Sequence, residues 1–232
     1  MKTSMTLIEG LQKLVEDSDK YIDQLLVGKL IKLEIKLTDT NERVTLAVGK
    51  ELTVEVGSHE PDLELTMNSE TLQKILDGGA DFGALIGRSK LSDNRPINII
   101  IRKLENKTDA IRVLYSLMTL FFTPGKLKAK KLKKQMAGEA HGAHPIPIVY
   151  WNGVRYAWYF IKEGETLNEA GEVDPYPQVF VILNGEGIAQ IGDQDIDLSP
   201  EMAVYIPINT IHRVVAKQDL TLMWLAWATP LI

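Results

Sequence analysis

Four polar side chains in the C-terminal part of the chain could bind a metal ion or transfer protons. Glu172 and Asp174 are two residues apart, and side chains two apart on a β-strand project from the same face. Gln178 follows nearby, and His212 can reach the same place from a neighbouring strand of a barrel. Two carboxylates, an amide and an imidazole form an oxygen-rich set that suits Mn²⁺, Mg²⁺ or Ca²⁺, with Zn²⁺ as a further candidate.

The sequence leaves three interpretations of this set open. In the first, all four residues bind a divalent ion. In the second, Pro175 and Pro177 interrupt strand pairing, so that the two carboxylates lie on a loop and the metal site is lost. In the third, His212 acts as a base beside one of the carboxylates. We favour the second interpretation, in which no catalytic residue is assigned.

The residues around this set have the alternation and turns of an all-β domain. Asn152-Gly153 is a two-residue hairpin turn between predicted strands at 148–151 and 154–162. Further short strands are predicted at 179–183, 187–191, 196–198, 203–206, 212–216 and 220–227. Closely spaced short strands joined by turns predict a barrel or a sandwich.

Two spacings in this region resemble the motifs of the cupin family. The first cupin motif has two histidines two apart, three or four residues, a glutamate, six residues and a glycine. The second has a glycine, five residues, a proline, one residue, a glycine, two residues, a histidine, three residues and an asparagine. The matching positions here are Glu172, Asp174, Gln178 and Gly185, then Glu201, Pro207, Asn209, His212 and Ala216.

The cupin resemblance covers about residues 150–228, and of the second motif only Pro207 and His212 keep the expected residue types. It implies a cupin barrel, which is a double-stranded β-helix or jelly roll, with a degenerate metal position. It also implies a homodimer, because cupins commonly pair by strand exchange.

Aromatic side chains of the same region give a candidate ligand site. Tyr156, Trp158 and Phe160 alternate on one strand face, and Trp224 lies on another strand. These side chains predict either ordinary core packing or a barrel mouth that suits a small apolar or aromatic molecule. We name the first three as candidate ligand-binding residues.

The first 125 residues predict an α+β domain. An apolar side chain every three or four residues from Leu7 predicts an opening helix with a break near Ser18. Period-two patterns at 30–37, 44–48, 52–56 and 63–67 predict an antiparallel meander. Ser69 is predicted to cap the next helix, and Gly78 to end it. A short helix at 82–86, a strand at 97–102 and a last helix at about 109–122 follow.

The run from Asp62 to Leu72 (DLELTMNSETL), followed by Gly78 to Leu91 (GGADFGALIGRSKL), resembles the sterol carrier protein family of the second type. The resemblance covers about residues 5–122, and the chain departs from the family pattern at 93–96. In that family a five-stranded antiparallel sheet and its helices enclose an apolar tunnel for lipid-like ligands.

The last predicted helix is apolar on nearly every side, so it is either a plain core helix or the wall of such a tunnel. The candidate ligand-binding residues on it are Leu114, Met118, Phe121 and Phe122.

A basic segment joins the two halves, giving predicted boundaries at 1–125, 126–144 and 145–232. Its lysines are Lys126, Lys128, Lys130, Lys131, Lys133 and Lys134. They predict a solvated helical linker or, as an alternative, a weak peripheral contact with an anionic membrane surface. His141 and His144 follow in a segment rich in alanine and glycine, which predicts a flexible tether rather than a metal site.

Composition excludes several classes of protein. The formal net charge is −5, and residues 145–232 carry 4 basic and 11 acidic residues, so a nucleic-acid binder is not expected. The chain has no cysteine, which excludes disulfides and cysteine nucleophiles. The first residues lack the features of a signal peptide, and the apolar stretch 110–122 is shorter than the roughly 20 residues that span a bilayer. A cytoplasmic protein is therefore expected.

These patterns together predict a protein that binds a lipid-like or other small apolar molecule and carries a cupin module. The alternative is a divalent-metal-dependent cupin enzyme that acts on a small molecule, with Glu172, Asp174, Gln178 and His212 as ligands.

Overall fold

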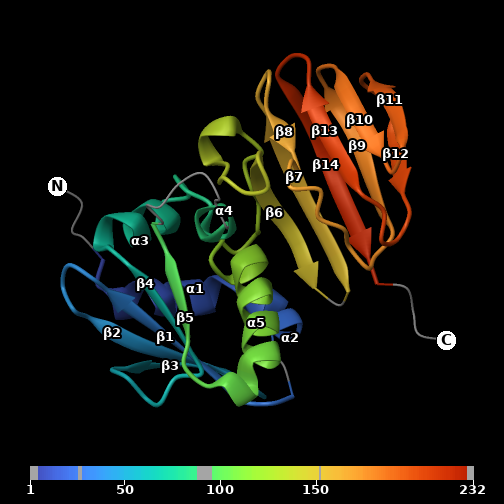
Figure 1. Cartoon of the computed structure of the whole chain (residues 1–232). Helices are drawn as coiled ribbons and strands as arrows, with labels where there is room; N and C mark the ends of the chain where they lie inside the picture. The colour runs from blue at the N-terminus through green and yellow to red at the C-terminus, as the bar shows by residue number, and fades with distance from the viewer. Residues whose placement is uncertain (1–4, 26–27, 88–95, 152, 229–232) are drawn as a thin grey trace. The chain divides into compact units, whose positions relative to one another are not determined.

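The computed structural model describes residues 5–25, 28–87, 96–151 and 153–228, which fall into two compact units. Of the described residues, the N-terminal unit contains 5–25, 28–86 and 96–131, and the C-terminal unit contains 87, 132–151 and 153–228 (Figure 1). The division lies inside the segment predicted to join two domains. None of the helices in the described ranges is long and apolar enough to cross a membrane.

The N-terminal unit opens with helix α1 (Leu7–Asp17), which begins with a capping box between Thr6 and Glu9. The predicted break near Ser18 is present, and η1 (Asp19–Tyr21) and α2 (Ile22–Leu25) follow it. The strands are β1 (Ile31–Leu37), β2 (Arg43–Val48), β3 (Leu52–Val56), β4 (Leu63–Met67) and β5 (Asn98–Ile101). The later helices are α3 (Ser69–Leu76), α4 (Phe82–Ile86), η2 (Leu104–Asn106), α5 (Lys107–Ser116) and the π-helical η3 (Leu117–Phe121).

The five strands form one mixed sheet in the order β3-β2-β1-β4-β5. Strands β1, β2 and β3 form the predicted antiparallel meander, but β4 pairs with β1 in parallel. The predicted four-stranded meander is therefore wrong at its last strand, and the sheet is not purely antiparallel. Alternation along a strand identifies its buried face but not its partner, so the sequence could not show this crossing.

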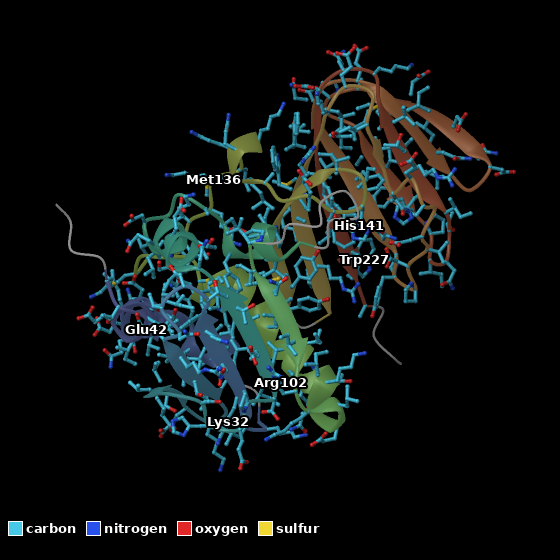
Figure 2. The ribbon with its side chains drawn as sticks, turned by 60° about the vertical axis from the view of Figure 1, so that its left-hand side comes forward. Lys32, Glu42, Arg102, Met136, His141 and Trp227 are labelled. Atoms are coloured by element: carbon cyan, nitrogen blue, oxygen red, sulfur yellow. The ribbon has the colours of Figure 1, made fainter. Side chains whose placement is uncertain are left out.

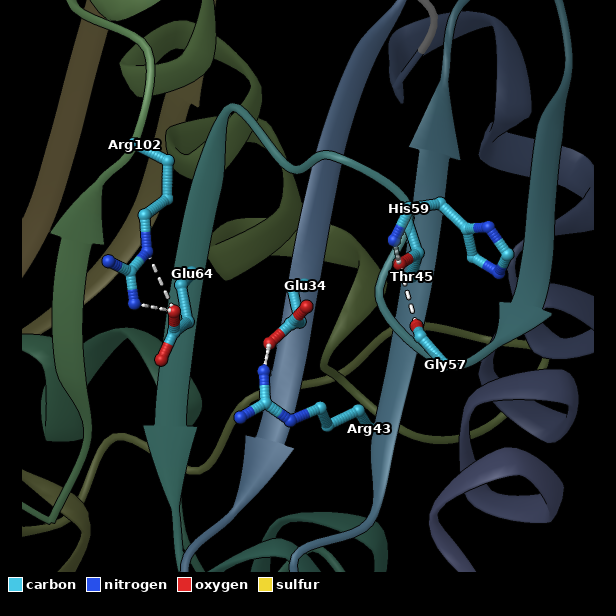
Figure 3. A network of polar contacts seen from close by, with 7 residues as sticks. All are labelled: Glu34, Arg43, Thr45, Gly57, His59, Glu64 and Arg102. Carbon is cyan, nitrogen blue, oxygen red and sulfur yellow. Dashed lines mark hydrogen bonds and ion pairs between the residues drawn. The ribbon is translucent and has the colours of Figure 1, made fainter.

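The two faces of this sheet differ in chemistry. Helices α1 and α5 pack on one face, which presents the fully buried Leu33 and Ile35. The other face carries Glu34 and Glu64, which are also buried, in register on β1 and β4 (Figure 3). Arg43 donates to Glu34 at 2.9 Å, and Arg102 pairs with Glu64. Each buried carboxylate thus has a cationic partner, as burial of charge requires.

Two predicted helix boundaries need correction. Asn68, not Ser69, caps α3, because its side-chain oxygen accepts from the backbone of Thr71 at 2.8 Å. The last predicted helix is not one regular helix, since α5 ends at Ser116 and passes into η3. The short helix at 82–86 was predicted with its observed bounds.

The joining segment is not the predicted solvated helix. Residues 126–133 form no helix, and η4 (Lys134–Met136) is a single 3-10 turn. The Lys130 side chain is only 10% exposed and lies 2.8 Å from the buried carboxylate of Asp81. Lys128 donates to the backbone oxygen of Thr123 at 2.7 Å. These two lysines are held inside the N-terminal unit, so they do not contribute to a freely solvated basic surface.

The C-terminal unit is all-β and consists of two sheets. Its strands are β6 (His144–Trp151), β7 (Val154–Ile161), β8 (Thr166–Leu167), β9 (Gln178–Asn184), β10 (Gly187–Ile191), β11 (Gln194–Leu198), β12 (Ala203–Ile206), β13 (His212–Ala216) and β14 (Leu220–Trp227). One sheet has the order β11-β10-β13-β8 and the other β12-β9-β14-β7-β6. The predicted strands are all present, and the two-residue β8 is an addition. Asn152 of the predicted hairpin turn lies outside the described residues.

The core of this unit lies between the two sheets. It is formed by alternate residues of facing strands, among them Ala157, Tyr159, Phe180, Val214 and Leu222. Side chains of a strand alternate between its two faces, so the inward position of each strand is fixed by these residues. The polar residues Gln178 and His212 occupy inward positions at the starts of β9 and β13.

Candidate functional site

The four predicted metal ligands do not form one cluster. Glu172 and Asp174 lie in the loop between β8 and β9, as the second interpretation of the sequence predicted. The Glu172 carboxylate is half exposed and lies 3.2 Å from Nδ1 of His141, a residue labelled in Figure 2. Gln178 and His212 are on strands and are buried to 1% and 6% exposure.

Asn168 fixes the loop and the histidine strand relative to each other. Its side-chain amide donates to the backbone oxygens of Glu172 and His212 at 2.8 and 2.7 Å, and its side-chain oxygen accepts from Glu172 at 3.0 Å. The Asn168 backbone has φ of 57°, a left-handed conformation that asparagine tolerates. No motif in the sequence points to Asn168, whose only signal is an asparagine between two short strands.

The side-chain amide of Gln178 has one satisfied end and one unsatisfied end. The indole N–H of Trp224 donates to Oε1 of Gln178 at 2.6 Å. An indole nitrogen is only a donor, so its partner must be the amide oxygen, and this fixes which end of the amide is nitrogen. That nitrogen, Nε2, is buried and has no hydrogen-bond partner in the described part of the chain.

The tautomer of His212 follows from the same kind of argument. Nδ1 of its ring lies 3.0 Å from the backbone oxygen of Thr210. A carbonyl oxygen only accepts, so Nδ1 carries the hydrogen, and in the neutral ring Nε2 is left as an acceptor. The ring contacts Phe180, with centroids 6.0 Å apart, and Phe180 is two residues from Gln178 on the same face of β9.

Aromatic rings surround these two polar residues on the inside of the barrel. The ring of Trp224 meets the ring of Tyr159 edge to face at 6.3 Å and lies 6.4 Å from the ring of Tyr150. Burial raises the pKa of Tyr159 well above its usual value, with smaller contributions from Tyr150 and from the negative charge of Asp174. Tyr159 is therefore a neutral phenol at physiological pH. The interior is largely apolar, with a few fixed polar atoms.

The aromatic residues predicted as ligand contacts lie on the other face of the sheet. Trp158 and Phe160 pack in a separate cluster with Ile146, next to Met136 and Met223. Tyr156 occupies the same outward register and is partly buried. The expectation that these three residues line the barrel mouth is corrected: Ala157, Tyr159 and Ile161 of β7 face the interior instead.

The residues at the cupin metal position do not fit a resident divalent ion. Among the described residues, no three histidine or acidic side chains come together as possible ligands. The Gln178 oxygen is occupied by an indole N–H, and the Glu172 carboxylate is beside His141. His212 has a nitrogen lone pair to offer at Nε2.

The apolar residues predicted to contact a ligand in the N-terminal unit are core residues. Leu114, Met118, Phe121 and Phe122 are each at most 5% exposed. The Phe122 ring stacks on Phe82 with centroids 3.7 Å apart and meets Phe121 edge to face. This packing is that of a filled core.

The two facing sheets of the C-terminal unit define an all-β barrel of the jelly-roll class. Residues 157–228 match the family model for the cupin domain, so this unit contains a cupin domain, as the motif spacings predicted. The match does not extend to the N-terminal unit, and nothing found there supports the resemblance to sterol carrier proteins. No curated protein matches the chain.

Solved structures similar to the chain include several cupins. A cupin 2 conserved barrel domain protein from Salinispora arenicola is 13% identical, with a TM-score of 0.40, over 44% of this chain and 90% of that one. A cupin superfamily protein from Desulfitobacterium hafniense is 19% identical, with a TM-score of 0.38, over 44% of this chain and 94% of that one. A predicted oxalate decarboxylase from Thermotoga maritima is 14% identical, with a TM-score of 0.35, over 38% of this chain and 81% of that one.

Proposed function

We propose that the cupin barrel binds a small organic molecule through Gln178 and His212, at the end of the barrel where β9 and β13 begin. The observation that carries this proposal is the buried Nε2 of Gln178, which has no partner in the described residues although the other end of the amide is fixed by Trp224. A buried donor left without an acceptor costs about 1–3 kcal/mol. A ligand atom that accepts from Nε2 removes this cost, so the free protein is arranged for such an atom.

His212 supplies the complementary group. Its ring nitrogen Nε2 accepts in the neutral tautomer that Thr210 selects, and it can therefore take a hydrogen bond from a ligand donor. The partly buried ring of Trp224 and the core rings of Tyr159 and Phe180 lie beside these two polar residues. Such a site suits a molecule with an apolar or aromatic body and a polar end.

We do not extend the proposal to the other functions that the sequence suggested. The metal-dependent enzyme stays the alternative prediction, and it is not proposed because no three histidine or acidic side chains of the described residues come together. A lipid-like ligand in the N-terminal unit would need space that the stacked rings of Phe82 and Phe122 occupy. The homodimer, the membrane contact and the cytoplasmic location stay predictions.

The proposal is tested by screening a library of small fragments against the full chain with ligand-observed NMR. Hits are then compared with a Gln178→Met variant, which keeps the length of the side chain and removes the N–H donor. We expect hits that bind the wild type and lose binding in the variant, and saturating amounts should raise stability by about 2.7 kcal/mol at 100 times Kd. The matched control is Gln194→Met on the exposed strand β11, which should retain the hits. Hits that bind both variants equally, or no hits at all, would reject the site.

A further inference from the structure

Arg155 is a cationic side chain at the same end of the barrel. Its backbone pairs with Ala226, and Ala226 pairs in turn with Gln178, so the three lie in one row across β7, β14 and β9. Ala157 faces the core, and side chains two apart on a strand project from the same face. The side chain of Arg155 therefore projects toward the inside of the barrel. Arg155 belongs to no motif of the sequence, because it stands near the start of a strand among apolar residues.

The guanidinium of Arg155 stacks on Tyr176, with its central carbon 4.6 Å from the ring centroid. Tyr176 is two residues before Gln178 in the loop that leads into β9. Stacking uses the flat face of a guanidinium and leaves its N–H groups, which lie in the plane, free to donate. Arg155 forms no ion pair with an acidic residue in the described ranges of the chain, unlike Arg43 and Arg102 of the N-terminal unit.

We infer that the ligand of the barrel carries a carboxylate, which Arg155 binds at the mouth while the body of the molecule reaches Gln178. The inference rests on the proposed function and names the ligand class for the same site. The planar fork of an arginine matches the two oxygens of a carboxylate, and charge-assisted hydrogen bonds of this kind are about twice as strong as neutral ones. The donor of Gln178 is compatible with the same class, because it requires an acceptor.

Asp174 is the acidic group to weigh against this inference. It lies in the same loop, and its charge reaches Tyr159. No ion pair joins it to Arg155 in the described structure, and its backbone oxygen is tied to the backbone of Asn209 at 2.8 Å. Asp174 therefore leaves the guanidinium available and opposes a second negative charge, which favours a ligand with a single carboxylate.

Three planar probes of nearly equal size separate the possible ligand classes: benzoate, benzamide and benzamidinium. They share one ring and differ in carrying a negative charge, no charge or a positive charge. Isothermal titration of the full chain should give the highest affinity for benzoate and the lowest for benzamidinium. In Arg155→Gln the affinity for benzoate should fall by about 10- to 100-fold, the usual effect of losing a hydrogen bond to a charged group. The affinity for benzamide should change by less than about threefold.

Two further variants complete the test. Arg155→Lys keeps the charge and loses the fork, so it should fall between wild type and Arg155→Gln. Arg112→Gln removes an exposed arginine of the N-terminal unit and should bind benzoate as the wild type does. Thermal unfolding of each variant checks that it is folded.

The outcomes separate the two proposals. Benzamide binding as tightly as benzoate, with both lost in Gln178→Met, would overturn the carboxylate inference and support the proposed function. Benzoate binding that survives Arg155→Gln would also overturn the inference. If none of the three probes binds, the carboxylate inference fails, while the proposed function is decided by the fragment screen.

Discussion

Both units bury polar side chains, and they differ in how those side chains are satisfied. In the N-terminal unit the buried carboxylates are matched by cations, as in Glu34 with Arg43 and Asp81 with Lys130, while one buried hydroxyl, that of Ser18, has no hydrogen-bond partner in the described residues. Glu34 keeps one oxygen without a donor, but its charge is balanced. In the cupin barrel the buried polar side chains are two amides and an imidazole, those of Asn168, Gln178 and His212, and Nε2 of Gln178 has no partner in the described residues.

Paired and unpaired buried groups serve different purposes, the first stability and the second binding. The charges of a buried ion pair are already paired within the fold, so the pair has no charge left to bind another molecule. A neutral amide with one end fixed is costly in the free protein and useful when an acceptor arrives. We therefore assign the buried ion pairs of the N-terminal unit to structure and propose binding only for Gln178 and His212 of the barrel.

The comparison is tested most strongly at the Lys130–Asp81 pair. Lys130→Met leaves the carboxylate of Asp81 buried without its cation and should cost the N-terminal unit about 3–5 kcal/mol. Urea unfolding followed by helical circular dichroism measures this, because all α-helices of the described residues lie in that unit. The neighbouring exposed lysine gives the control, and Lys131→Met should change stability by less than about 0.5 kcal/mol. Equal effects of the two variants would contradict the structural role.

The two faces of β7 should also behave differently. Trp158→Ala removes a buried ring from the outer face and should destabilise the C-terminal unit by about 3 kcal/mol. It should leave benzoate affinity unchanged, because Trp158 does not face the barrel interior. The remaining tryptophans, Trp151, Trp224 and Trp227, all lie in this unit, so their fluorescence follows its unfolding. Loss of benzoate binding in this folded variant would place the ligand on the wrong face.

Changes to the hydrogen-bonded pair Gln178 and Trp224 should affect ligand binding more than stability. Gln178→Met combined with Trp224→Phe removes both hydrogen-bonding partners and keeps similar shapes, so stability should stay within about 1 kcal/mol of the wild type. Binding of fragments that depend on Gln178 should be lost. A loss of several kcal/mol would indicate that the amide is a structural group.

The smallest predicted effect concerns Lys128. Partial burial lowers its pKa from 10.5 to about 8, with the charge of Asp17 opposing the shift. Between pH 8 and pH 10.5 Lys128 is protonated more often in the unfolded chain than in the folded one. Its contribution to the free energy of unfolding therefore rises with pH through this range. Unfolding of the wild type and of Lys128→Gln below and above pH 8 should show this gain only in the wild type. The same slope in both would mean that Lys128 is not the group responsible.

Much of the barrel could be predicted from the sequence, because its strands are short, alternate in polarity and are separated by clear turns. Strands β10, β12, β13 and β14 have the bounds that the pattern predicted. In the N-terminal unit the elements were predicted but the pairing of β4 was not, since pairing depends on contacts distant in sequence.

The inner face of β7 could not be predicted for a local reason. From Tyr156 to Ile161 the strand is an uninterrupted run of apolar and aromatic residues, so alternation gives no sign of which face is inside. Gln178 and His212 were predicted as metal ligands, but their hydrogen bonds with Trp224 and Thr210 depend on tertiary contacts that spacing in the sequence does not show. The position of Arg155 beside Gln178 depends on the strand register, which the sequence does not show.

The side-chain amide resonances of Gln178 test the central claim most directly. They can be assigned by their absence in Gln178→Met and followed in the nitrogen–proton NMR spectrum of the full chain during titration with benzoate. We predict that both N–H resonances of Gln178 shift with the same saturation as the ligand binds, because Nε2 gains an acceptor. Saturable binding of benzoate that leaves these resonances unchanged would contradict the account.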